Sequence, residues 1–168
     1  WGHTIQLDEL RGLGMDFADK RANVIVMESD ADNELFLGIN FHPSIIATIE
    51  ESNPEILLND ASLDSFCVVA EELSHFHLIA NRADRKVPIS KLELEVQGEI
   101  DKVLAAGLLL EQQCGDAHLL SLARKVFDHA CITVHCEQGL YWQATRLAAA
   151  FWFDHLREGV KSPRMIRS

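Results

Sequence analysis

The spacing of apolar and polar residues changes about a third of the way along the chain. Two β-rich runs, at 23–28 and 34–41, flank five turn-forming residues, and this arrangement predicts a β-hairpin. A proline near its start favours a short helix over 43–52, and the segment 55–58 (EILL) predicts one further short strand. The first third of the chain is therefore expected to form a small antiparallel sheet.

From residue 62 onward, apolar residues recur every three or four positions, which predicts four substantial helices. The first spans about 62–81 and is capped by Ser62 or Asp60, and the second spans about 88–112. The third begins near Gly115, and the fourth follows Gly139. The apolar stripes of the second and fourth helices are Ile89, Leu92, Val96, Ile100 and Val103, and Leu140, Ala144, Leu147, Ala148, Phe151 and Trp152. The expected fold class is α+β, in a single domain over 1–168 whose C-terminal helical pair occupies 116–158.

Composition narrows the choice of partners. The 168 residues are 48% hydrophobic, so one domain can bury a core without disulfides or structural metal. With 15 Lys and Arg against 26 Asp and Glu, the formal charge is −11, which disfavours binding to nucleic acid or to an anionic membrane. No signal peptide or membrane-spanning run is evident, and the four cysteines show no CxxC spacing, so we expect a reducing, cytoplasmic location.

The predicted helix at 62–81 contains the most unusual pattern in the chain. Within 66–80, ten of fifteen residues are apolar and none is basic, yet Glu71, Glu72 and His75 lie in the middle. Because Glu71 and His75 are four residues apart, they project from one face of the helix. Two interpretations stay open: a structural ion pair within the core, or a pair that holds one cation.

The pattern Glu-Glu-x-x-His differs by one residue from His-Glu-x-x-His, in which two histidines hold zinc and the glutamate is a general base. On the next helix, residues 97–106 (QGEIDKVLAA) contain Glu99, which follows His75 by 24 residues. Over about 20–110 the chain resembles small gluzincin-like metallopeptidases of the ImmA/IrrE type. The resemblance implies a zincin-like domain with Glu71, His75 and Glu99 as metal ligands and Glu72 as the catalytic base.

Glu71 replaces the first ligand histidine of that family. The resemblance therefore implies altered or lost peptidase activity, a regulatory role, and zinc or a harder divalent metal such as manganese, or no metal at all. The rival interpretation is a non-catalytic helical interaction module with a structural Glu71–His75 pair. Instead of a ligand role for Glu99 or Glu95, the spacing of Lys91, Glu95, Glu99 and Lys102 also fits an exposed ladder of ion pairs.

Two other groups of residues were candidates for function. His129, Cys131, His135 and Cys136 include metal-ligand types, but their helical spacing opposes convergence on one ion. Trp142, Ala149 and Phe153 lie seven and four residues apart, outside the main apolar stripe. This second strip predicts a homodimer or protein-partner surface, or else packing beneath the hairpin.

Overall fold

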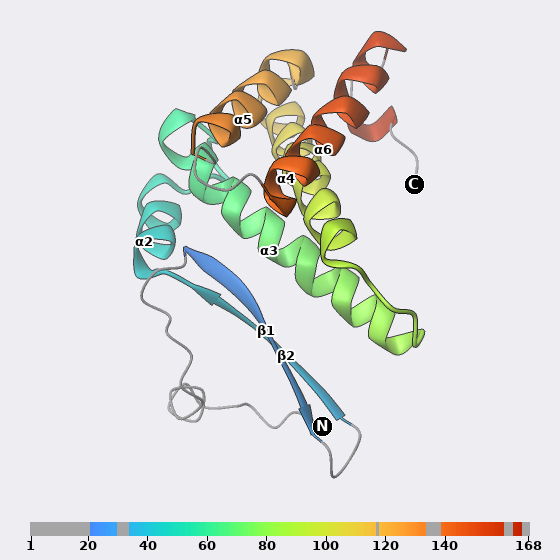
Figure 1. Ribbon diagram of the computed structural model, residues 1–168. Coiled ribbons are helices and arrows are strands. Elements are labelled where there is room, and N and C mark those ends of the chain that lie inside the picture. Colours follow the sequence, from blue (N-terminus) through green and yellow to red (C-terminus); the bar gives the residue numbers. More distant parts are fainter. Residues whose placement is uncertain (1–20, 30–33, 117, 134–138, 160–162, 166–168) are drawn as a thin grey trace.

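The computed structural model describes residues 21–29, 34–116, 118–133, 139–159 and 163–165, and it confirms an α+β fold (Figure 1). A two-stranded antiparallel sheet precedes five α-helices within these residues. The elements are β1 (Ala22–Ser29), β2 (Glu34–Phe41), α2 (Pro43–Ser52), α3 (Asp60–Asp84), α4 (Lys91–Cys114), α5 (Leu119–Thr133), α6 (Leu140–Arg157) and the 3-10 turn η1 (Pro163–Met165).

The predicted hairpin is confirmed. The two strands pair in register from Ala22 opposite Phe41 to Ser29 opposite Glu34. Both strands contact α3, which lies between the hairpin and the helices α4 and α6 in Figure 1. An ion pair between Arg21 and Asp64 links the start of β1 to α3. The hairpin thus covers one side of α3 and leaves the other side to the helices.

The predicted strand at 55–58 is wrong. This segment forms a turn followed by irregular backbone; the Ile56 and Leu57 N–H groups donate to the Asn53 carbonyl oxygen, and the side chain of Gln113 on α4 binds other backbone groups. The Gln113 amide nitrogen donates to the carbonyl oxygens of Pro54 and Glu55, at 2.7 and 3.1 Å, and its oxygen accepts from the Leu58 N–H at 2.8 Å. The backbone of this segment is therefore satisfied by its own turn and by one side chain rather than by a neighbouring strand.

The two long helices begin with side-chain caps. Asn59, rather than the expected Ser62 or Asp60, caps α3, and Ser62 completes a reciprocal capping box as the third helical residue. Ser90 caps α4 through the Glu93 N–H. That helix ends at Cys114 and is followed by the C-cap residue Gly115, whose φ of 77° favours glycine. These caps set the lengths of the two helices that form the candidate site.

The apolar core lies between α3, α4, α5 and α6. Trp152 is completely buried at its centre, and its indole N–H donates to the Ile100 carbonyl oxygen at 3.2 Å. Leu147, which the sequence places in the apolar stripe of α6, is instead exposed. The buried members of the core are Leu58, Leu63, Cys67, Val103, Ala106, Leu119, Leu122, Ala123, Val126, Phe127, Ala148 and Trp152.

The buried face of α4 is polar over its first half, contrary to expectation. Glu95, Glu99 and Lys102 are buried, whereas the predicted stripe residues Leu92, Val96 and Ile100 are only partly buried. The expected exposed ladder of ion pairs is therefore wrong for these three charged residues. Apolar burial on α4 begins at Val103, where the helix enters the core.

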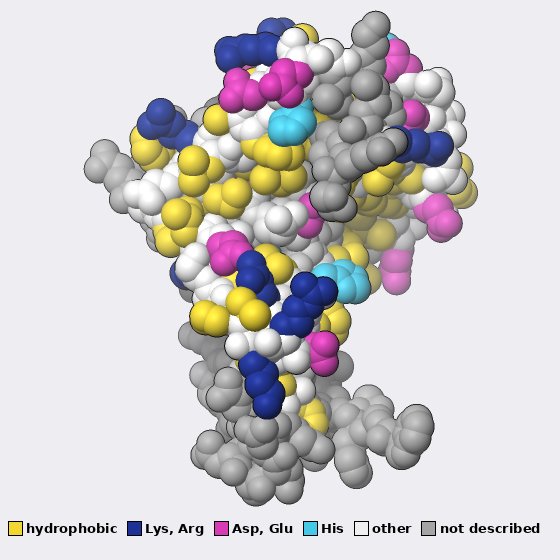
Figure 2. Space-filling model, turned by 90° about the vertical axis from the view of Figure 1, so that its right-hand side faces the viewer, with side chains coloured by type: hydrophobic (Ala, Val, Ile, Leu, Met, Phe, Trp, Pro, Cys, Tyr) yellow, Lys and Arg dark blue, Asp and Glu magenta, His cyan; other side chains and the backbone are white. Residues whose placement is uncertain are grey.

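The candidate partner strip is divided between surface and core. Trp142 is 45% exposed, with the Arg146 guanidinium 4.5 Å from its ring centre. Ala149 and Phe153 pack against the core, and Phe153 meets Phe127 edge to face. On the face shown in Figure 2, hydrophobic side chains gather in patches among charged ones. Among the described residues, no helix combines the length and the apolar character that crossing a bilayer requires.

Candidate metal centre

The candidate site lies where α3 crosses α4, and Gly98 allows the close approach. A Cβ atom at position 98 would lie 2.6 Å from Nε2 of His75 and 3.0 Å from Cγ of Glu71. Both distances are shorter than ordinary carbon contacts, so the His75 ring occupies the space that a larger residue would fill. The absence of a side chain at Gly98 therefore lets two α3 side chains reach across α4.

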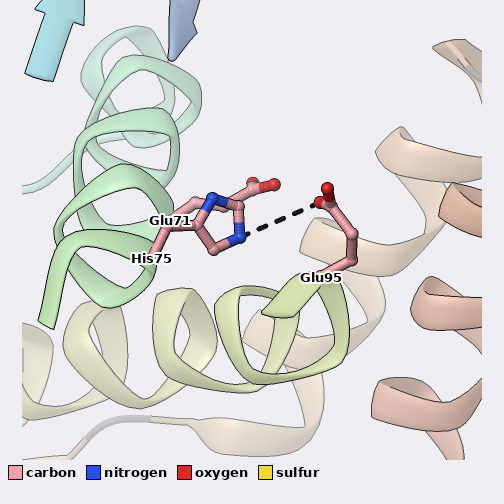
Figure 3. A group of neighbouring side chains, drawn as sticks. All are labelled: Glu71, His75 and Glu95. Atoms are coloured by element: carbon pink, nitrogen blue, oxygen red, sulfur yellow. Dashed lines mark ion pairs between the residues drawn. The ribbon is translucent and has the colours of Figure 1, made fainter. Parts of the chain in front are cut away.

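Three side chains converge at this crossing. Glu71 and His75 project from α3, and Glu95 projects toward them from α4 (Figure 3). One ligand atom from each of the three lies within 4.8 Å of the others, and Nε2 of His75 is 3.8 Å from Oε2 of Glu95. Two carboxylates and one imidazole therefore surround a space of the size that one cation requires.

Glu72 lies at the other edge of the His75 ring. Oε2 of Glu72 lies 3.8 Å from Nδ1 of His75, on the side of the ring away from Glu95. In metal sites, a carboxylate at one ring nitrogen commonly fixes the tautomer that presents the other nitrogen to the metal. Nε2 of His75 is buried and makes no hydrogen bond with any described residue. The ring thus presents to Glu71 and Glu95 a nitrogen that makes no hydrogen bond within the described residues.

The protonation equilibria of His75 and Glu95 reflect their shared burial. Burial opposes the charged imidazole, but the contact with Glu72 and the charges of Glu95 and Glu71 outweigh it and raise the pKa of His75. Burial also raises the pKa of Glu95, and the nearby Glu71 adds to this effect while His75 opposes it. Both groups therefore bind protons more readily than they would in water.

A second polar group adjoins the first through Glu71. The Lys102 ammonium lies 2.7 Å from Oε1 of Glu99 and 3.2 Å from Oε2 of Glu71, and its side chain is only 9% exposed. Burial would lower the pKa of Lys102, but Glu71 and Glu99 outweigh it and raise the value. Burial likewise raises the pKa of Glu99, although Lys102 and the nearby Thr145 hydroxyl oppose the shift. Glu71 therefore faces both the His75–Glu95 pair and a buried ammonium.

A separate set of hydrogen bonds fixes the two helices beside the site. The Ser74 hydroxyl donates to Asp101 at 2.6 Å, and the Gln97 amide donates to the other Asp101 oxygen at 2.8 Å. Ser74 precedes His75 directly, so this link sets the register of α3 against α4 where the ring crosses. The sequence pattern gave no indication of it.

Two of the three metal ligands expected from sequence, Glu71 and His75, lie together, and Glu95 is the α4 carboxylate that joins them. The third expected ligand, Glu99, is paired with Lys102 instead. The sequence feature that could have indicated this helix crossing is Gly98, which lies between Glu95 and Glu99 inside a predicted helix. The side chains of His129, Cys131, His135 and Cys136 lie outside the described residues.

Comparison of the chain with protein-family models, with curated proteins and with solved structures returned no match.

The charges of the crossing favour a cation. Four carboxylates, from Glu71, Glu72, Glu95 and Glu99, lie around one ammonium and one imidazole. Glu95 and Glu99 are buried, and buried carboxylates are unfavourable unless they bind a proton, an ion-pair partner or a metal. Lys102 neutralises one charge, so an excess of negative charge remains around His75.

Proposed function

We propose that Glu71, His75 and Glu95 bind a divalent cation, in a zincin-like domain whose peptidase activity is altered or lost. The observation that carries this proposal is the buried Nε2 of His75, which faces two carboxylates and makes no hydrogen bond within the described structure. A buried ring nitrogen without a hydrogen bond is unfavourable unless a proton or a metal occupies it.

The ligand set favours a borderline or moderately hard ion. Imidazole suits zinc and other transition metals, whereas carboxylates also suit manganese and magnesium. One imidazole with two carboxylates therefore makes Zn²⁺ and Mn²⁺ the first ions to test. Glu71 is the most exposed of the three ligand side chains, at 23%, so it supplies the route by which an ion reaches the buried pair.

Altered or lost peptidase activity is proposed for two reasons. Glu71 takes the place of a histidine, which puts more negative charge on the ligands and reduces the Lewis acidity that a metal supplies in hydrolysis. Glu72 occupies the position that the resemblance assigns to the general base, but it contacts Nδ1 of His75. This position suits Glu72 to interact with the ring. The role of Glu72 as a catalytic base stays a prediction.

Calorimetric titration of the chelator-treated full chain with Zn²⁺ and Mn²⁺ tests the metal site. We expect one ion per chain and a loss of at least about tenfold in affinity for His75→Gln and for Glu95→Gln, because each removes a ligand. Glu93→Gln is the matched control, since Glu93 lies on the same helix but pairs with Arg82 outside the site. Undetectable binding to the unsubstituted chain, or equal effects of Glu93→Gln and Glu95→Gln, would refute the proposed site.

The second candidate function is a non-catalytic interaction module in which these groups only hold helices together. It is favoured by the contacts that link α3 to α4 without metal, namely those of Lys102 with Glu71 and of His75 with Glu95. Under this proposal the exposed Trp142 contributes to a homodimer or partner surface in the cytoplasm. Light scattering on the wild type and on Trp142→Ala tests it, and a monomeric wild type would exclude the dimer.

A further inference from the structure

Lys102 is placed to control which carboxylates are free to bind an ion. Its ammonium is buried between Glu99 and Glu71, at 2.7 and 3.2 Å, and both contacts fall within hydrogen-bond distance. Glu71 belongs to the candidate metal group, and Glu99 does not. The lysine therefore holds one carboxylate of the site and one carboxylate beside it.

We propose that Lys102 is a built-in cation that limits the metal affinity of the site by competing for Glu71 and by keeping Glu99 out of the coordination sphere. This inference rests on the proposed metal site and identifies the residue that sets its affinity for metal. Lys102 thus acts as a positioning residue, because it acts on the metal only through the two carboxylates.

Two physical effects act in the same direction. An ammonium close to a ligand carboxylate repels an incoming cation, and in a partly desolvated site this repulsion is only weakly screened. The same ammonium also occupies Oε1 of Glu99, while Oε2 of Glu99 is buried without a hydrogen bond of normal geometry to the described residues. Removal of the ammonium would therefore lower the repulsion and also free the Glu99 carboxylate to act as a fourth ligand.

Lys102 also links the two helices of the candidate site. Glu71 and Glu99 belong to different helices, so Lys102 joins α3 to α4 in the absence of metal. The pairing leaves Glu71 with a second partner, which a metal ion must displace or share. The metal and the ammonium thus compete for the same carboxylate.

The test compares Mn²⁺ and Zn²⁺ titrations of the full chain carrying Lys102→Met, Lys102→Arg, Glu99→Gln and the double substitution Lys102→Met/Glu99→Gln. Lys102→Met keeps the length of the side chain and removes its charge, so we expect affinity to rise by at least about tenfold, a typical size for changes beside metal ligands. Lys102→Arg keeps the charge and should bind as the wild type does. Lys125→Met is the matched control, because Lys125 pairs with Asp60 away from the site and its loss changes the net charge equally.

Glu99→Gln tests the same idea without removal of the lysine. With Glu99 neutral, the ammonium is left to Glu71 alone, and metal affinity should fall. The double substitution should bind more weakly than Lys102→Met, because the released carboxylate is no longer available. Glu99→Gln also keeps the inference testable if Lys102→Met does not fold, as judged by circular dichroism.

The outcomes separate the inference from the proposed function. If the wild type binds metal but Lys102→Met binds equally or more weakly, Lys102 does not limit affinity and only the inference fails. If binding appears only in Lys102→Met, the inference is supported and the proposed function of the natural chain fails. If neither chain binds either ion, both are wrong.

Discussion

Replacement of Gly98 by alanine is the most direct test of the helix crossing. In an ordinary helix interior this change stabilises a protein, because glycine is less favourable there than alanine by roughly 0.5–1 kcal/mol. At Gly98 the added methyl group would lie 2.6 Å from Nε2 of His75 and 3.0 Å from Cγ of Glu71. Both side chains must therefore move, and the ring is enclosed by Glu72 and Glu95.

The magnitude follows from the two opposing contributions. Overpacking of a closely packed interior typically costs about 1–3 kcal/mol, which exceeds the gain in helix propensity. We therefore expect a net loss of about 1 kcal/mol in the free energy of unfolding, or a fall of about 2–4 °C in Tm for a chain of this size. Displacement of the ring from Glu95 should also lower Mn²⁺ and Zn²⁺ affinity by at least about tenfold.

Urea denaturation and metal titration of Gly98→Ala measure the two effects. Gly107→Ala is the matched control on the same helix, because its methyl group would lie 2.8 Å from both Leu119 and Pro163, away from the candidate ligands. It should lose stability and keep its metal affinity. The reasoning fails if Gly98→Ala is more stable than the wild type by about 1 kcal/mol, the ordinary gain for a helix, with unchanged affinity.

Three further predictions concern acidity, thiols and ligand type. Because the pKa values of His75 and Glu95 are raised above 6.5 and 4.5, their contribution to stability is complete below those ordinary values and is lost as pH rises through the folded-state values. The chelator-treated protein should therefore gain Tm between pH 8 and pH 6, and a fall over this range would contradict the assignment. Burial raises the pKa of the Cys67 thiol to about 12, so at pH 8 iodoacetamide should modify exposed Cys114 and spare Cys67, as peptide mapping can show. Glu71→His adds an imidazole ligand and removes one partner of the buried ammonium, so it should bind Zn²⁺ more tightly than the wild type in calorimetry, and equal affinities would exclude Glu71 as a ligand.

Much of the fold could be predicted because its signals are local. The hairpin follows from two β-rich runs and a turn, and the existence of the four longer helices follows from apolar spacing. The strand expected at 55–58 failed because EILL has strand composition, whereas the backbone groups at its two ends bond to Gln113 on a helix distant in sequence. No local pattern contains that partner.

The polar face of α4 shows a second limit of prediction from residue spacing. The alternation of Lys91, Glu95, Glu99 and Lys102 is typical of an exposed ion-pair ladder, and the same spacing serves equally well for a buried one. What decides between them is the facing helix. Glu71 and His75 on α3 supply partners for these charges, so burial of three of the four becomes possible.

The choice between Glu95 and Glu99 as the third ligand shows where periodicity stops being informative. The two residues are four positions apart, so they share one face of α4 and differ by about 6 Å along its axis. Helical spacing fixes the face, but the position along the axis depends on where α3 crosses. That crossing is set by Gly98, which admits the His75 ring, and by the bond from Ser74 to Asp101, which fixes the register. A one-turn shift of α3 along α4 would exchange the two carboxylates, so the identity of the candidate ligand is a property of helix packing rather than of the Glu-Glu-x-x-His pattern.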